Sequence, residues 1–276
     1  MIKNFFNNFV MYYKVYKVIN FSILFLPINI FFLKIFLPIK KIKIFDFKDK
    51  RKVIYLRADN LITHFRSNLF FVKEKEVRHF IDEKLKKDQI FFDIGANIGV
   101  FSIYSAVRKN ALVYSFEPEY SNLSILKENI LKNRLYNNIF PYSLAIGKNN
   151  NLTNLHIADL TPGAAVSSIS NEKIKNTDEG YQVVWKEGVV EMKLDDICDQ
   201  LKIIPNMLKI DTDGNENNVL MGSENILKNK KLKFIIMEKP SNEKNRINAY
   251  EILKKNDYKE INIDNSRNSF WEKVIN

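Results

Sequence analysis

Short apolar runs alternate with stretches of helical periodicity along the last two thirds of the chain. The apolar runs predict seven strands, at residues 90–92, 111–116, 139–146, 207–210, 234–237, 258–263 and 270–274. Apolar residues spaced three or four apart predict helices between them, at residues 100–107, 121–132, 217–227 and 245–255. Strands that alternate with helices indicate an α/β fold. We therefore expect a Rossmann-like, mostly parallel seven-stranded sheet with helices on both faces and a C-terminal antiparallel hairpin.

Three other segments add to this pattern. Residues 152–185 break into short β-prone runs with turn residues, which predicts a β-rich insertion after the third strand, over the carboxyl ends of the strands. Residues 42–47 and 53–56 predict two short strands joined by a polar turn. Residues 74–85 predict a helix with one apolar face that packs beside the sheet.

The first strand of the sheet runs into a turn of small and polar residues, Asp93-x-Gly95-x-Asn97-x-Gly99. Glycines let the chain turn sharply, and the N-terminus of the next helix offers backbone N–H groups to a ligand. The negative charge of Asp93 would repel a pyrophosphate and attract a ligand with cationic groups. S-adenosylmethionine, which carries a sulfonium and an ammonium group, fits this requirement better than a dinucleotide.

A second acid supports the same cofactor. Glu117 ends the next strand, 18 residues after Gly99, where a carboxylate can accept hydrogen bonds from both ribose hydroxyls. An ordinary strand, turn and helix with capping acids is the alternative, and Ser121 is the expected N-cap of the following helix. Further acids follow the fourth and fifth strands, so a set of carboxylates should meet at one edge of the sheet: Asp93, Glu117, Asp211, Asp213 and Glu238.

The charge of +11 is unevenly distributed, since residues 1–52 contribute +9 and residues 53–276 only +2. We therefore divide the chain into a basic, aromatic N-terminal segment, residues 1–52, and a catalytic domain, residues 53–276. The N-terminal segment would suit the surface of an anionic membrane, and packing against the domain or a partner is the alternative. The single cysteine, Cys198, fits a reducing compartment, and no cluster of Cys and His suggests a metal site. We expect a cytoplasmic protein, at the inner face of the membrane if the N-terminal segment docks there.

The catalytic domain resembles the FkbM-type methyltransferases, within the class I S-adenosylmethionine-dependent fold. The resemblance rests on four segments, with PGAAVSS (162–168) and KLDDI (193–197) in support: FFDIGANIGVFSIYSA (91–106), YSFEPE (114–119), LKIDTDGNENNVLMG (208–222) and FIIME (234–238). It implies the following cofactor contacts: Asp93, Gly95, Asn97 and Gly99 at the methionine part, Glu117 at the ribose and the segment around Ser143 at the adenine. It also implies that Asp211 and Glu216 face the reaction centre. Asp213 departs from the family, which usually has glutamate there.

The resemblance implies methyl transfer to an oxygen, with a sugar hydroxyl on a glycan, a glycolipid or a related precursor as the acceptor. A carboxylate within reach of that hydroxyl can accept its proton, and we expect Asp211 to do so, with Glu216 and Glu238 next in line. Two alternatives stay open, an RNA methyltransferase and a non-catalytic protein that only binds the cofactor. The nearly neutral catalytic domain makes nucleic acid an unlikely partner.

Overall fold

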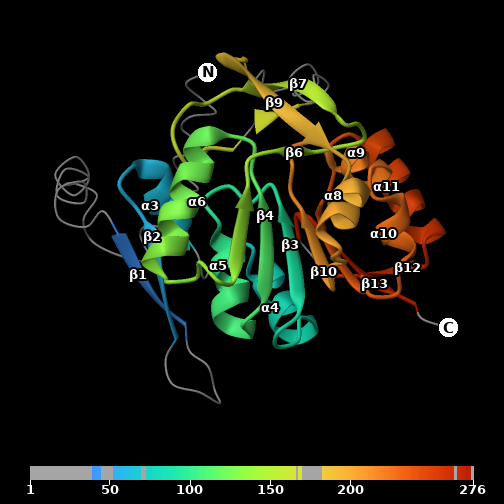
Figure 1. The fold of residues 1–276 in the computed structure, drawn as a ribbon, viewed down its shortest axis with the longest axis horizontal. Coiled ribbons are helices and arrows are strands. Elements are labelled where there is room, and N and C mark those ends of the chain that lie inside the picture. The colour runs from blue at the N-terminus through green and yellow to red at the C-terminus, as the bar shows by residue number, and fades with distance from the viewer. Residues whose placement is uncertain are drawn as a thin grey trace.

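The main sheet of the protein has the predicted α/β architecture. The computed structural model describes residues 39–44, 52–69, 73–165, 167–169, 182–263 and 266–274. All neighbouring strands of the sheet are parallel except for β13, which is antiparallel to both of its neighbours. The strand order is β12 (Tyr258–Ile261), β13 (Asn268–Lys273), β11 (Phe234–Glu238), β10 (Met207–Ile210), β3 (Ile90–Ile94), β4 (Leu112–Phe116) and β5 (Ile139–Tyr142) (Figure 1).

Helices cover both faces of this sheet and create two apolar cores. Three helices pack on one face: α4 (Lys75–Lys84), α5 (Val100–Lys109) and α6 (Tyr120–Lys132). Four pack on the other: α8 (Leu194–Leu201), α9 (Glu216–Met221), α10 (Glu224–Lys228) and α11 (Glu243–Lys255). Neighbouring residues of a strand point to opposite faces, so Phe91 enters the first core and Phe92 the second. Strands buried on both faces appear in the sequence as uninterrupted apolar runs, which is why their positions were predictable.

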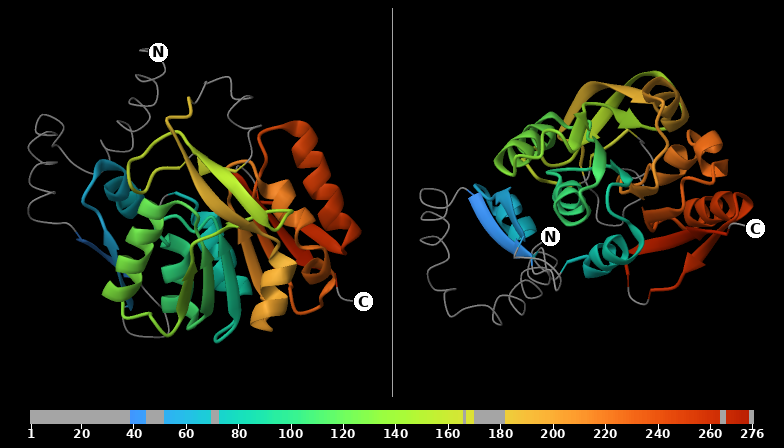
Figure 2. Two further views of the ribbon diagram at one scale, coloured as in Figure 1. Left: turned by 45° about the horizontal axis from the view of Figure 1, so that its top comes forward. Right: turned by 60° about the horizontal axis from the view of Figure 1, so that its bottom comes forward.

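A second, four-stranded sheet lies across the carboxyl ends of the parallel strands, as the sequence predicts (Figure 2). Its order is β6 (Ala145–Ile146), β9 (Trp185–Met192), β7 (Asn151–Ile157) and β8 (Ser167–Ser168). The expected single strand at residues 139–146 is wrong, because the chain leaves the main sheet after Tyr142 and pairs with β9 from Ala145 onward. The second sheet therefore starts where the third parallel strand ends.

Two helix predictions also need correction. The helix expected at residues 217–227 is split into α9 and α10 at Gly222, where an added Cβ would lie 2.0 Å from the Gly147 carbonyl oxygen. This close backbone approach gives a reason for glycine at the break. The cap of α6 is Glu119 and not Ser121, because the Glu119 carboxylate accepts bonds from the N–H groups of Ser121 and Asn122.

The N-terminal part of the described chain forms an antiparallel hairpin of β1 (Ile39–Ile44) and β2 (Lys52–Arg57), followed by α3 (Leu61–Asn68), which the sequence analysis did not predict. Two asparagines at the C-terminal end of α6 bond to the edge of β2 that does not pair with β1. Asn129 accepts a bond from Arg57 N, and the C-cap residue Asn133 bonds to both backbone groups of Tyr55. Residues 1–38 lie outside the described residues, and the predicted membrane contact of the N-terminal segment stays a prediction. No helix of the described chain has the length and apolar character needed to cross a bilayer.

Candidate active site

The turn after β3 is held rigidly between two neighbouring strands. Gly95 has φ +74°, and a Cβ added to it would lie 1.8 Å from the carbonyl oxygen of Asp211, at the end of β10. Asn97 and Gly99 also have positive φ values, 51° and 81°. The turn therefore needs glycine at position 95 for close backbone approach as well as for conformation.

The backbone N–H groups of this turn are used inside the protein. Gly95 and Ala96 donate to the Phe116 carbonyl, Asn97 donates to the Glu117 carboxylate at 2.7 Å, and the next two N–H groups bond within the turn. The N–H groups of residues 95–99 are therefore all used within the protein, and the expectation that the N-terminus of the following helix offers N–H groups to a ligand stays a prediction. These bonds join the turn to the end of β4 and fix the position of Glu117.

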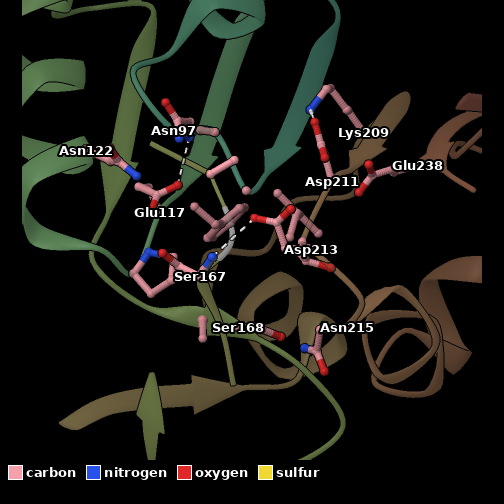
Figure 3. A pocket seen from close by; sticks show the side chains of 18 of the residues that line it. Asn97, Glu117, Asn122, Ser167, Ser168, Lys209, Asp211, Asp213, Asn215 and Glu238 are labelled. Carbon is pink, nitrogen blue, oxygen red and sulfur yellow. Dashed lines mark hydrogen bonds and ion pairs between the residues drawn. The ribbon is translucent and has the colours of Figure 1, made fainter. Parts of the chain in front are cut away.

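Glu117 ends β4 with its side chain in a pocket at the carboxyl ends of the strands (Figure 3). The residue is only 5% exposed, and its carboxylate accepts bonds from the N–H groups of Asn97 and Glu119. Among the described residues no cation pairs with it. Burial therefore raises the pKa of Glu117 to about 7, although the two backbone N–H groups oppose the shift. Each carboxylate oxygen keeps a lone pair for a hydroxyl donor from a ligand.

The neighbouring strands place two acids around one buried lysine. Lys209 is 2% exposed, and its Nζ lies 2.9 Å from Asp211 Oδ2 and 3.6 Å from Asp93 Oδ1. Burial alone would lower the pKa of Lys209, but Asp211 and Asp93 raise it. Burial raises the pKa of Asp93, while for Asp211 the opposite charges of Lys209 and Arg66 outweigh burial and lower the pKa. The shorter distance to Lys209 explains why Asp211 is the more strongly stabilised anion.

The loop after β10 owes its shape to Glu216. This residue is 1% exposed, and its Oε1 accepts bonds from Thr212 N, Thr212 Oγ1 and Gly214 N. The bonds hold Asp213 at φ +53°, with its carboxylate in the pocket and 3.3 Å from the backbone nitrogen of Ser167 (Figure 3). Glu216 thus shapes the reaction end of the pocket from behind the loop.

Six of the ten acids, glycines and polar residues singled out in the sequence line this pocket: Gly95, Asn97, Glu117, Asp211, Asp213 and Glu238. The structure places the other four, Asp93, Gly99, Ser143 and Glu216, outside the lining. Asp93 lies beneath the floor, where its Oδ2 accepts a bond from Ser102 at 2.6 Å. Ser143 is exposed at the break between β5 and β6, and its neighbours Leu144 and Ala145 line the pocket in its place.

A short strap, residues 162–165, borders the pocket on the side of the second sheet. Ala164 and Ala165 line the pocket, and four polar side chains from other elements bond to the strap. The four are Asn60 on Pro162 O, Arg66 on Gly163 O, Asn97 on Ala164 O, and Asn122 on both Gly163 N and Ala164 O. The strap is therefore fastened to the turn after β3 and to the two helices α3 and α6.

The sequence analysis did not single out Lys209, Asn122 or Arg66 as site residues. A lysine inside the apolar run 207–210 is a signal that could have marked Lys209, since a charge in a fully buried strand needs a partner. Asn122 and Arg66 gave no comparable signal, because exposed helices carry such residues at every turn. Among the described residues no group of three or more His, Cys, Asp or Glu side chains is placed to hold a metal ion.

These features fit a nucleoside with a cationic amino-acid tail. Glu117 presents a buried carboxylate for ribose hydroxyls, and the charges of Asp93, Lys209 and Asp211 sum to −1 next to it, which favours a cationic ligand. The main sheet has one reversed strand near its edge, and Glu117 follows its second parallel strand. Together these features are typical of the Rossmann-like S-adenosylmethionine-dependent methyltransferases. The described domain belongs to that class, whose cofactor is S-adenosylmethionine.

The chain belongs to the FkbM methyltransferase family, because the model of the methyltransferase FkbM domain matches residues 93–262, more than half of the chain. It is 25% identical over 169 residues to the hexuronic acid methyltransferase AglP of Haloferax volcanii. The matched region covers 60% of this chain and 62% of AglP.

Two solved methyltransferases are among the structures to which the chain is similar. The methyltransferase FkbM of Methylobacillus flagellatus is 16% identical with a TM-score of 0.47, over 76% of this chain and 52% of that one. The precorrin-6y C5,15-methyltransferase of Geobacter metallireducens is 14% identical with a TM-score of 0.42, over 74% and 91%. The chain thus spans less than two thirds of the length of AglP and of the Methylobacillus protein.

Proposed function

We propose that the enzyme methylates an oxygen of a sugar, most simply a hydroxyl group, in a glycan, a glycolipid or a related precursor. The observation that carries the proposal is the similarity to AglP, which is a hexuronic acid methyltransferase by name. The polar pocket agrees with such an acceptor, because carboxylates and guanidinium groups bond readily to sugar hydroxyls and acids. S-adenosylmethionine supplies the electrophilic methyl group, and the remaining steps depend on side chains of this chain.

The acceptor would lie at the end of the pocket above β10 and β11. Glu117 and Glu238 end strands that are three positions apart in the sheet, which separates them by roughly 14 Å at the usual strand spacing. With the ribose at Glu117, the reacting oxygen belongs near Asp211 and Glu238. Arg66 and Arg267 line the same region, where they are suited to a carboxylate or phosphate on the acceptor.

Methyl transfer forms a carbon–oxygen bond, breaks the carbon–sulfur bond and releases the hydroxyl proton. Positioning of the two reactants supplies much of the rate of such a displacement. A carboxylate must take the proton, and Asp211 and Glu238 lie within hydrogen-bonding range of each other. The lowered pKa of Asp211 makes it a weak base, so we assign proton acceptance to the neighbouring Glu238 and the positioning of that side chain to Asp211.

Two matched substitutions separate these roles. Asp211→Asn and Glu238→Gln keep the shape of each side chain and remove its charge. The variant that lacks the proton acceptor should lose about 10²- to 10⁴-fold in turnover with little change in S-adenosylhomocysteine affinity. Equal, full activity in both variants would contradict a carboxylate base at this end of the pocket.

The acceptor class itself is tested with simple sugars. The enzyme is incubated with S-adenosylmethionine and either methyl α-D-glucuronide or methyl α-D-glucoside, and products are identified by the mass gain of one methyl group. Alkaline treatment then distinguishes an ester, which is cleaved, from an ether, which is not. Methylation of RNA but of neither sugar under the same conditions would contradict the proposal.

A further inference from the structure

Two asparagines connect the ribose acid to the strap (residues 162–165). Asn97 donates its backbone N–H to Glu117 Oε2 and its side-chain amide to Ala164 O, both at 2.7 Å. The Asn122 Nδ2 donates to Ala164 O at 3.3 Å, and the Asn122 amide also stabilises the charged form of Glu117 and so opposes the rise of its pKa. Both asparagines lie beside Glu117 in the pocket (Figure 3). Glu117 and the strap are therefore linked twice, from the turn after β3 and from α6.

Asn122 is suited to hold the strap because an amide both donates and accepts. Its Oδ1 accepts the Gly163 N–H at 2.7 Å, and its Nδ2 donates to the carbonyl of the next residue. The residue is 4% exposed, and its own N–H bonds to the Glu119 carboxylate at 2.6 Å, so the first turn of α6 fixes its position. A carboxylate in its place would keep the bond from Gly163, lose the bond donated to Ala164 O and repel the Glu117 carboxylate.

The other anchors of the strap have no such link. Asn60 and Arg66 bond to the carbonyls of Pro162 and Gly163, and neither bonds to Glu117. These two residues can hold the strap whether or not a cofactor is bound. Among the described anchors of the strap, the two asparagines are the ones that act on Glu117, the carboxylate expected to bind the ribose.

We propose that Asn122 is a positioning residue that couples occupation of the ribose site to closure of the strap over the bound cofactor. A ribose that hydrogen-bonds to Glu117 fixes this carboxylate, which in turn fixes the Asn122 amide. The ordered amide then holds the peptide between Gly163 and Ala164 against the cofactor. Binding therefore orders the strap and slows cofactor release.

Hydrogen–deuterium exchange tests this coupling in the unsubstituted protein, with and without S-adenosylhomocysteine. Exchange of the Gly163 amide should slow by about tenfold or more when the ligand is bound, because its acceptor Asn122 becomes ordered. Unchanged exchange over residues 162–165 would overturn the proposal. This exchange experiment needs no substitution, so it tests the coupling even if a variant at position 122 does not fold.

A substitution then tests the residue. Asn122→Asp should bind S-adenosylhomocysteine about tenfold more weakly, mainly through faster dissociation, and ligand should no longer slow exchange of the strap. Asn133→Asp is the matched control, because Asn133 caps the C-terminus of α6 and bonds to β2, away from the strap. The control should keep the wild-type dissociation rate even if it melts at a lower temperature. An Asn122→Asp variant with the wild-type dissociation rate and ligand-dependent exchange would also overturn the proposal.

Discussion

Glu117 and Asp211 both end parallel strands of the same sheet and both line the same pocket, yet their surroundings shift their pKa values in opposite directions. Glu117 accepts hydrogen bonds from two backbone N–H groups and pairs with no cation of the described residues, and burial raises its pKa to about 7. Asp211 has the Lys209 ammonium group at 2.9 Å and the charge of Arg66 nearby, and its pKa is lowered. The pocket thus combines an end where a carboxylate can take up and release a proton near neutral pH with an end where the carboxylate stays charged.

The difference between the two ends fits two separate tasks. A ribose needs a carboxylate with lone pairs that are not already taken by a cation, and Glu117 provides it. A sulfonium and an ammonium group need a carboxylate that stays charged near neutral pH, and Asp211 provides it because its pKa is lowered. The following predictions are ordered from the largest expected effect to the smallest.

Removal of the Lys209 cation should abolish the difference between the two ends of the pocket. Lys209→Met leaves two carboxylates without their partner in a buried site and should cost about 3–5 kcal/mol in the free energy of unfolding at pH 7.5. The loss should become smaller at pH 5.5, since both acids can then take up a proton. Urea denaturation at the two pH values measures this. Lys84→Met removes a half-exposed ion pair with Glu272 and should cost at most about 1 kcal/mol; similar losses in both variants would show that Lys209 has no special role.

Removal of the Glu117 charge, at the opposite end of the pocket, should weaken cofactor binding and leave the fold intact. Glu117→Gln gives up charge-assisted bonds to the ribose, worth about 1.5–3 kcal/mol in the binding of S-adenosylhomocysteine at pH 8. Isothermal titration calorimetry measures the affinity, and a thermal melt checks that the variant is folded. Wild-type affinity in a folded variant would show that the ribose does not bind to Glu117.

Cofactor affinity should also depend on pH through Glu117. The pKa of its free carboxyl is about 7, and ribose hydroxyls favour the ionised form, so binding below pH 7 must release a proton. The dissociation constant should therefore rise by at most about tenfold for each pH unit below 7 and stay constant above it. Calorimetry at pH 6.5 in two buffers with different ionisation enthalpies counts the released protons. Glu117→Gln should lose this dependence; if it keeps the wild-type pH profile, another group titrates.

Local sequence patterns predicted most of the sheet, because buried parallel strands are continuous apolar runs. The strand at residues 207–210 was predicted with its observed ends. The errors arose where distant contacts decide the structure. Gly222 divides a helical pattern because the backbone of Gly147 lies against it, and the run 139–146 changes sheets after Tyr142 to pair with β9. Neither contact has a signal within the segment itself.

The candidate site was predictable to a similar degree. Acids at strand ends converge whenever the strands are parallel, so Glu117, Asp211 and Glu238 could be placed in one pocket from the sequence. The position of Asp93 beneath the floor could not, because it depends on Lys209 and Ser102 reaching it from other elements. The strap depends on side chains separated by up to 102 residues from their partners, as in the bond from Asn60 to Pro162.

The hairpin of β1 and β2 has a consequence for how the chain can be shortened. One edge of β2 pairs with β1, and side-chain amides of α6 occupy the other, so no further strand can add to it. Removal of residues 1–52 would take β1 away and leave one row of β2 backbone groups open to another chain. Such a protein could form aggregates for a reason unrelated to catalysis. Cleavage before residue 39 is less drastic, because it keeps β1 in place and the edge of β2 closed, and it removes four of the eleven basic residues of the N-terminal segment.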